Sequence, residues 1–118
     1  MTAGTYNITI EQGADWAMTL SLYTDSDKTT PKDISGYTAR MQIRETKSSP
    51  TVIKELTTGG SGITIGGTDD NEVSLVISSS DTSLFDFLTA YYDLELVSGG
   101  VVSRLMEGTV ALSKEVTR

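Results

Sequence analysis

The chain has 118 residues, 37% of them hydrophobic, a formal net charge of −7, and neither cysteine nor histidine. A chain of this length buries one contiguous core, so we expect a single domain spanning residues 1–118. Without cysteine there are no disulfides or thiolates, and without histidine the usual general base and metal ligand are missing, so we expect no enzyme, no cofactor and no small-molecule substrate.

Charge and hydropathy also restrict the partners. A net charge of −7 repels the phosphates of nucleic acids and of anionic lipids, so neither is expected to bind. Hydrophobic residues occur in short runs, well below the roughly 18 that a membrane span needs. The opening residues, Met1–Thr5, contain neither the basic nor the apolar segment of a secretory signal, so we expect the protein to be made and kept in the cytoplasm.

Two-residue alternation of apolar and polar side chains dominates the first third of the chain. It predicts strands over Tyr6–Ile10 and Trp16–Leu22, and Gly13 between them marks a reversal, so we expect these two strands to form an antiparallel hairpin. The polar run Thr24–Lys32 contains a proline and predicts a loop. A further strand, Tyr37–Glu45, follows it with unambiguous alternation.

The middle of the chain predicts shorter strands between turns. Thr51–Thr57 follows the turn-like Lys47–Pro50 and is expected to pair with the preceding strand at a sheet edge. Glycine-rich turns then flank a very short strand, Ile63–Ile65. Alternation resumes with Val73, Leu75 and Ile77.

The segment Ser78–Leu88 breaks this pattern. Its large apolar residues are grouped at helical spacing, and Ser80 or Asp81 is a candidate cap, so we expect one or two helical turns crossing from one sheet to the other. Those apolar residues are Leu84, Phe85, Phe87 and Leu88. Strands then follow around Tyr92–Leu96 and over Val102–Leu112, and Gly108 in the last one predicts a bend or bulge.

About eight short strands, with turn signals roughly every 8 to 12 residues, indicate an all-β antiparallel sandwich or barrel. One short helical crossover interrupts the strands, and residues 113–118 form a polar tail. No parallel βαβ spacing and no internal repeat are present in the sequence.

One loop carries oxygen-bearing side chains that suit a hard cation. Asp69, Asp70 and Glu72 lie beside glycines, and calcium prefers oxygen ligands of this kind. Their spacing is not that of an EF-hand loop, and a simple Asp/Asn-rich turn accounts for the same residues. Calcium at these residues is therefore only the weaker alternative.

Carboxylates on neighbouring predicted strands raise the question of acid–base chemistry on a glycoside. Asp93, Glu95 and Glu107 are candidates. However, the alternation places Asp93 and Glu95 opposite the apolar face, where solvated strand positions explain them. Of Tyr91 and Tyr92, one ring is expected in the core with its hydroxyl bonded to backbone, and the other is free to meet a partner.

Three blocks of sequence resemble small virion proteins of tailed bacteriophages, in particular the immunoglobulin-like N-terminal module of baseplate upper proteins and tail fibre adaptors. The blocks are Tyr6–Trp16, Asp33–Arg44 and Tyr92–Leu96 with Leu105–Val110. This resemblance implies an immunoglobulin-like sandwich that docks on a baseplate or tail, and it implies no active site. The positions that carry it, Gly13, Gly36, Tyr37 and Gly108, are turn and core positions.

We therefore expect a non-enzymatic virion structural protein, a tail or baseplate adaptor that attaches fibres or spikes and assembles symmetrically with other virion proteins. Edge strands are docking templates, and the expected docking edge carries Val52, Lys54 and Leu56. Two alternatives stay open, a capsid decoration protein of the phage head and a carbohydrate-binding or adhesion module.

Overall fold

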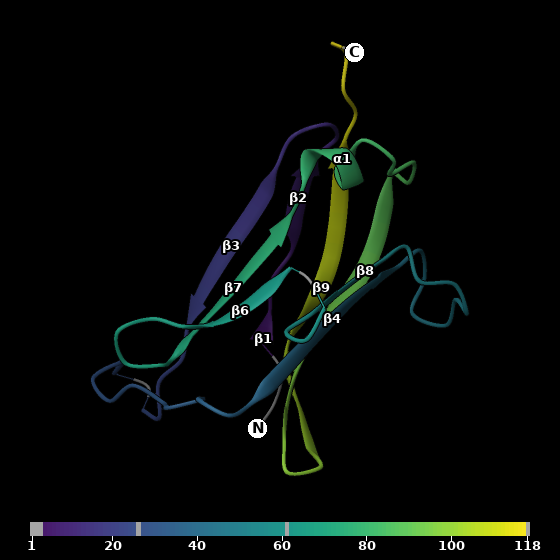
Figure 1. Cartoon of the computed structure of the whole chain (residues 1–118). Coiled ribbons are helices and arrows are strands. Elements are labelled where there is room, and N and C mark those ends of the chain that lie inside the picture. Colours follow the sequence, from purple (N-terminus) through teal and green to yellow (C-terminus); the bar gives the residue numbers. More distant parts are fainter. Residues whose placement is uncertain (1–3, 26, 61, 118) are drawn as a thin grey trace.

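The computed structural model describes residues 4–25, 27–60 and 62–117. In this part of the chain nine strands and one short helix form two facing sheets (Figure 1). No helix in these residues is long and apolar enough to cross a membrane. The strands are β1 Gly4–Thr5, β2 Ile8–Glu11, β3 Trp16–Ser21, β4 Thr38–Arg44, β5 Lys54–Thr57, β6 Ile63–Gly66, β7 Glu72–Ile77, β8 Thr89–Ser98 and β9 Val101–Ser113, and the helix is α1 Ser79–Thr82.

The larger sheet has six strands in the order β1-β9-β8-β4-β5, with β2 also paired to β9. Both β1 and β2 run parallel to β9, and the other pairs in this sheet are antiparallel. The predicted hairpin between the first two strands is therefore wrong, because the chain leaves β2 and enters the other sheet as β3. Parallel pairing sets the buried Ile8 and Ile10 against the buried Val110 and Leu112.

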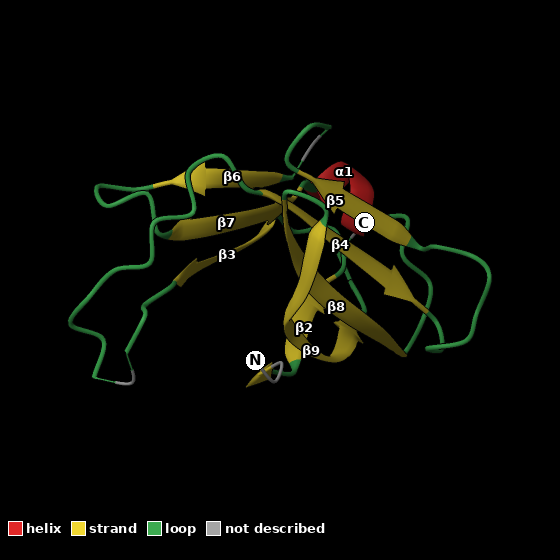
Figure 2. Ribbon diagram, turned by 90° about the horizontal axis from the view of Figure 1, so that it is seen from below, coloured by secondary structure: helices red, strands yellow, loops and turns green. Residues whose placement is uncertain are grey.

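The smaller sheet is antiparallel, in the order β3-β7-β6 (Figure 2). Its central strand β7 buries Val73, Leu75 and Ile77 completely or nearly so, as expected from their alternation. Apolar residues from both sheets meet in one core between the layers. The fold is thus the expected all-β sandwich.

Two predicted strands differ in their bounds. The strand predicted over Thr51–Thr57 begins only at Lys54, so Val52 precedes it, but its place at the edge of the larger sheet is confirmed. The strand predicted over Ile63–Ile65 extends to Gly66.

The irregularity in β9 does not lie at Gly108. Leu94 pairs with Met106 and the next residue, Glu95, pairs with Arg104, so the extra residue of the bulge is Leu105. Gly108 serves a close approach instead, because a Cβ there would collide with the backbone carbonyl of Tyr6.

The crossover between β7 and β8 is confirmed, but its helix is short. The cap is Ser78, whose side chain accepts from the Asp81 amide, and neither Ser80 nor Asp81 takes that place. After Thr82 the chain is not helical. Phe85 and Phe87 are buried at two-residue spacing, whereas Leu84 and Leu88 are exposed. A cluster of apolar residues is compatible with helical and with two-residue spacing, and in this segment burial follows the two-residue spacing.

Tyr92 is the buried member of the tyrosine pair, and its hydroxyl donates to the Tyr6 carbonyl at 2.5 Å. Burial raises the pKa of Tyr92 from 10.0 to about 12. A raised folded-state pKa means that the contribution of this hydroxyl to stability is complete below pH 10 and is lost as the pH rises through 12.

Tyr92→Phe is expected to cost about 1 kcal/mol at neutral pH, because the hydrogen bond is lost. The variant should also lose less stability than the wild type between pH 10 and 12, because it has no hydroxyl to ionise at this position. Urea unfolding at several pH values measures both effects. If the free energy of unfolding fell equally with pH in the two proteins, ionisation of the Tyr92 hydroxyl would not be coupled to folding.

Candidate docking site

The three residues predicted to form the docking edge do not share one outer face. Leu56 is only 2% exposed and belongs to the core, whereas Val52 lies before the strand. The Lys54 side chain turns toward α1, where its Nζ lies 2.8 Å from Oδ2 of Asp81. The predicted edge is present, with Lys54 and Leu56 on it and Val52 before it. Among the described strands β5 pairs only with β4, and its last residue, Thr57, forms one bridge to Gly62.

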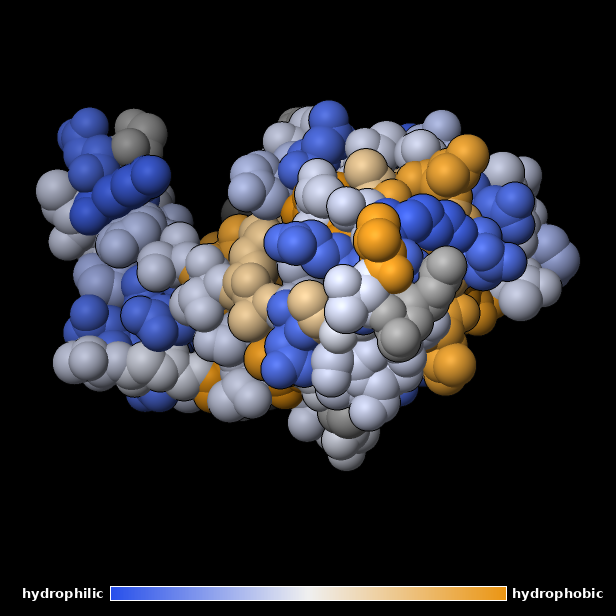
Figure 3. Space-filling view, turned by 90° about the horizontal axis from the view of Figure 1, so that it is seen from above, coloured by the Kyte–Doolittle hydropathy of each residue, from blue (hydrophilic) through white to orange (hydrophobic). Residues whose placement is uncertain are grey.

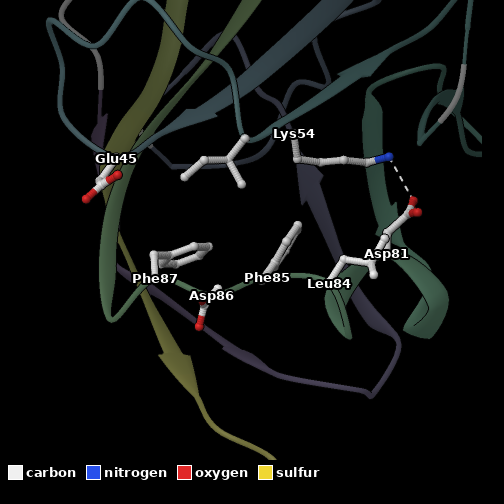
Figure 4. A pocket seen from close by; sticks show the side chains of 8 residues that line it. Glu45, Lys54, Asp81, Leu84, Phe85, Asp86 and Phe87 are labelled. Carbon is white, nitrogen blue, oxygen red and sulfur yellow. Dashed lines mark hydrogen bonds and ion pairs between the residues drawn. The ribbon is translucent and has the colours of Figure 1, made fainter.

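A pocket of about 540 Å³ lies beside this edge, and we call it the docking pocket. Figure 4 shows the Phe85 and Phe87 rings on one side and Lys54 across from them. The rings are tilted, with centroids 5.5 Å apart, and Leu84 next to them is 80% exposed. The lining residues are Glu45, Ile53, Lys54, Asp81, Leu84, Phe85, Asp86 and Phe87. Seen from the α1 end, the surface alternates apolar and hydrophilic patches (Figure 3).

The wall of the docking pocket is held in place by the β2–β3 turn. The Thr82 hydroxyl is fully buried, donates to the Ala14 carbonyl at 2.8 Å and accepts from the Gly13 amide at 3.1 Å. The Ser79 amide donates to Asp15, and the Gln12 side chain donates to the Phe85 carbonyl. These bonds fix the backbone from α1 to Phe85, so the pocket is a preformed feature of the fold.

The rim of the docking pocket is acidic. It carries the carboxylates of Glu45, Asp81 and Asp86, of which Asp81 pairs with Lys54 and Asp86 pairs with Lys114. The hydrogen bond and charge of Lys54 hold the pKa of Asp81 below its ordinary value, and Lys114, 2.9 Å from Asp86, lowers the pKa of Asp86 in the same way. Both carboxylates therefore stay charged at neutral pH, and the site suits a partner with apolar and basic side chains.

The carboxylates that raised the question of glycoside chemistry lie on the outer face of the larger sheet. Asp93 and Glu107 are direct cross-strand partners, and Arg104 contacts both, at 3.6 and 3.3 Å. Glu95 is bonded to Arg40 at 2.8 Å. Burial raises the pKa of Asp93, and the nearby Glu95 carboxylate adds to the shift. The three carboxylates thus pair with arginines on the outer face of the sheet, which is the face that the alternation predicts for Asp93 and Glu95. Tyr91 lines a smaller pocket of about 190 Å³ on this face.

The residues of the calcium alternative lie in and beside the turn between β6 and β7. Asp69 and Asp70 lie in the β6–β7 turn, where Asp70 has a positive φ of 52°, and the side chain of Glu72 lies against Gly67. Among the residues that the structure describes, no three Asp or Glu residues come together as a possible metal site.

The exposed position of Leu84 is the feature of this site that the helical interpretation of the sequence missed. Helical spacing groups Leu84 with Phe85 and Phe87, but of these three only the two phenylalanines are buried. A two-residue reading of Leu84–Leu88 would have placed Leu84, Asp86 and Leu88 on the outer side.

Comparison with known proteins bears on the fold. No protein-family model matches the sequence, and no curated protein matches it. Among solved structures, a marsupial T cell receptor matches with a TM-score of 0.51 at 12% identity, over 95% of this chain and 51% of the receptor chain. The extracellular fragment of novel immune-type receptor 11 from Ictalurus punctatus, with its stalk region, matches with a TM-score of 0.39 at 15% identity, over 100% and 89% of the two chains.

This chain thus spans about half the length of the T cell receptor chain that it matches. The strand orders agree with that likeness: β3-β7-β6 corresponds to strands B, E and D of an immunoglobulin domain, and β9-β8-β4-β5 to strands G, F, C and C′. At 12% sequence identity, the match to the T cell receptor shows a shared fold and says nothing about function. The chain is an all-β, immunoglobulin-like sandwich.

Proposed function

We propose that this chain is a non-enzymatic structural protein of a tailed-bacteriophage virion, a tail or baseplate adaptor that docks on neighbouring subunits and attaches fibres or spikes. The observation that carries the docking role is the open edge of β5 beside a preformed pocket with an apolar wall and an acidic rim. The virion setting, with assembly in the host cytoplasm, rests on the sequence blocks that resemble phage adaptor modules. The likeness to immune receptors concerns the fold and favours no setting.

Docking at this site would combine two kinds of contact. A partner strand can add to the free edge of β5 through backbone hydrogen bonds, which supply affinity without sequence preference. An apolar side chain of the partner can enter the docking pocket against Phe85, Phe87 and the exposed Leu84, and this contact selects the partner. The acidic rim favours a basic residue next to that anchor.

Leu84→Asp is the sharpest test of this site, since Leu84 is 80% exposed and the substitution leaves the core untouched. We expect roughly tenfold lower incorporation into particles, because a carboxylate in the desolvated contact would face an already acidic rim. Incorporation is measured by quantitative mass spectrometry of purified particles after complementation. Val116→Asp is the matched control, because Val116 is 91% exposed and lies outside the docking pocket.

Normal incorporation of Leu84→Asp would rule out this docking site. Mass spectrometry of heads purified without tails distinguishes the tail adaptor from a capsid decoration protein. A decoration protein would be present in such heads, whereas a tail or baseplate adaptor would be absent. Carbohydrate binding is the other alternative, and the one feature that favours it is Tyr91 in the shallow pocket on the larger sheet.

A further inference from the structure

The second free edge of the sandwich is β3, which ends the smaller sheet (Figures 1 and 2). Its inward residues Trp16, Met18 and Leu20 are only partly buried, although the corresponding residues of the neighbouring strand β7 are buried completely or nearly so. No described strand covers the far side of β3. The core is therefore open along this edge.

A groove of about 550 Å³ follows the open edge, between β3 and the β1 and β9 strands of the larger sheet. Apolar side chains dominate it, and none of the described residues that line it is charged. The lining comprises Gly4, Thr5, Tyr6, Met18, Thr19, Leu20, Leu22, Leu105 and Met106. Tyr6 is 53% exposed, so this apolar surface is open to contact with apolar side chains of a partner.

A second copy of this chain fits this edge, because β3 is uncharged and an antiparallel register sets its apolar side chains against those of the copy. Each copy carries −7, so two copies repel one another over most of their surface. The seven residues Trp16–Leu22 contain no ionisable side chain. The other described edges are shorter or end in a charged residue: β5 has four residues and carries Lys54 and Glu55, β2 ends in Glu11, and β6 has four residues and ends in glycine. We infer that two copies pair antiparallel through β3 about a twofold axis.

The backbone and the facing of the side chains fix how β3 meets its copy. The Leu22 amide donates to the Asn71 carbonyl on the β7 side, so the alternate residues Ala17, Thr19 and Ser21 present their amides and carbonyls to the free edge. Pairing Thr19 with Thr19 of the copy joins these edge residues to one another. It also sets Met18 opposite Leu20 and Trp16 opposite Leu22, so apolar side chains meet over the grooves of both copies.

The result is one continuous sheet of six strands made from two three-stranded sheets. The dimer leaves the docking pocket free, because that pocket lies beside β5 in the other sheet. Dimerisation is therefore separable from docking, and each can be tested without the other.

The absence of cysteine from the chain makes the test direct, because one introduced thiol is the only thiol in the protein. Purified Thr19→Cys in oxidised glutathione should form a disulfide-linked dimer in most of the chains, because cross-strand partners at a twofold axis lie within disulfide reach. Thr64→Cys is the matched control, an exposed threonine on β6 at the other edge of the same sheet. It should remain monomeric under the same conditions.

Light scattering of the cysteine-free protein gives the second readout. The wild type should have twice the 12.6 kDa chain mass, and Thr19→Lys should have the monomer mass at the same concentration, because it brings two like charges together at the axis. Circular dichroism of Thr19→Lys checks that the variant is folded, so that a monomer mass cannot be attributed to unfolding. A wild type that is monomeric at its highest soluble concentration, or equal crosslinking at positions 19 and 64, would overturn the inference.

Discussion

Replacing Gly108 by alanine is expected to destabilise the fold by about 3 kcal/mol, at the upper end of the usual cost of overpacking. The added Cβ would collide with the carbonyl oxygen and carbon of Tyr6. Because the obstacle is backbone, no rotation of a side chain can relieve the contact. The same carbonyl accepts the Tyr92 hydroxyl, and Tyr92 pairs directly with Gly108, so the strain would loosen the β1–β2 segment from β9.

Urea unfolding followed by circular dichroism measures the effect as a lower midpoint. Gly59→Ala is the matched control, since a Cβ at Gly59 meets nothing within 4 Å and the backbone there has no positive φ. The control should change stability by less than about 0.5 kcal/mol. If both variants unfolded at the same urea concentration, the close approach of Tyr6 to β9 would not exist in solution.

The second large effect is expected for Leu94→Ala, which should cost about 3 kcal/mol. Leu94 is 0% exposed on β8, and its cross-strand partners Met41 and Met106 are both buried. Removing its isobutyl group leaves a cavity that the paired strands on both sides cannot close.

Leu88→Ala is the control for Leu94→Ala, because Leu88 is 76% exposed and should tolerate the same truncation with a change below about 0.5 kcal/mol. Thermal unfolding and urea unfolding should agree on the ranking of the two variants. A similar loss at both positions would mean that β8 is not the centre of the core.

Alternation in the sequence predicts which side of a strand is buried, but it says nothing about the partner strand. Ile8 and Ile10 face the core as expected, yet they pair with β9, about a hundred residues away in the chain. Two strands joined by a short turn favour a hairpin by default. Here the turn at Gly13 instead carries the chain to the opposite sheet, and this choice is made by packing that local sequence does not reveal.

The crossover is less helical than its sequence predicts, for a related reason. Phe85 and Phe87 belong to a dense apolar cluster, and such clusters fit helical and extended spacing equally well. The helix ends at Thr82, and the Thr82 hydroxyl is bonded to Ala14 and Gly13 in the β2–β3 turn, a contact between residues far apart in the chain. Sequence reasoning therefore found the crossover but not the exposed Leu84.

At the docking edge, too, the sequence predicts the strand but not the direction of its side chains. The edge position of β5 follows from its short, weakly alternating sequence, whereas the inward direction of Lys54 depends on Asp81, which α1 brings into reach. The uncharged run Trp16–Leu22, in contrast, is readable in the sequence, and only its exposure at a sheet edge required the structure.

The structure also shows how this sandwich does without the disulfide that joins strands B and F in antibody domains. The chain has no cysteine, and the corresponding strands β3 and β8 contribute Met18 and Leu94 to one core. Its single tryptophan lies on β3 instead of on the strand that corresponds to C. A search for the Cys and Trp spacing of antibody domains would have missed this fold.

The proposed role is that of a virion component that binds its neighbours through its strand edges and the docking pocket. The most direct test is quantitative mass spectrometry of purified phage particles. We expect the chain in every particle at a copy number that matches the symmetry of the tail or baseplate. Particles that are complete and infectious without this chain would contradict the account.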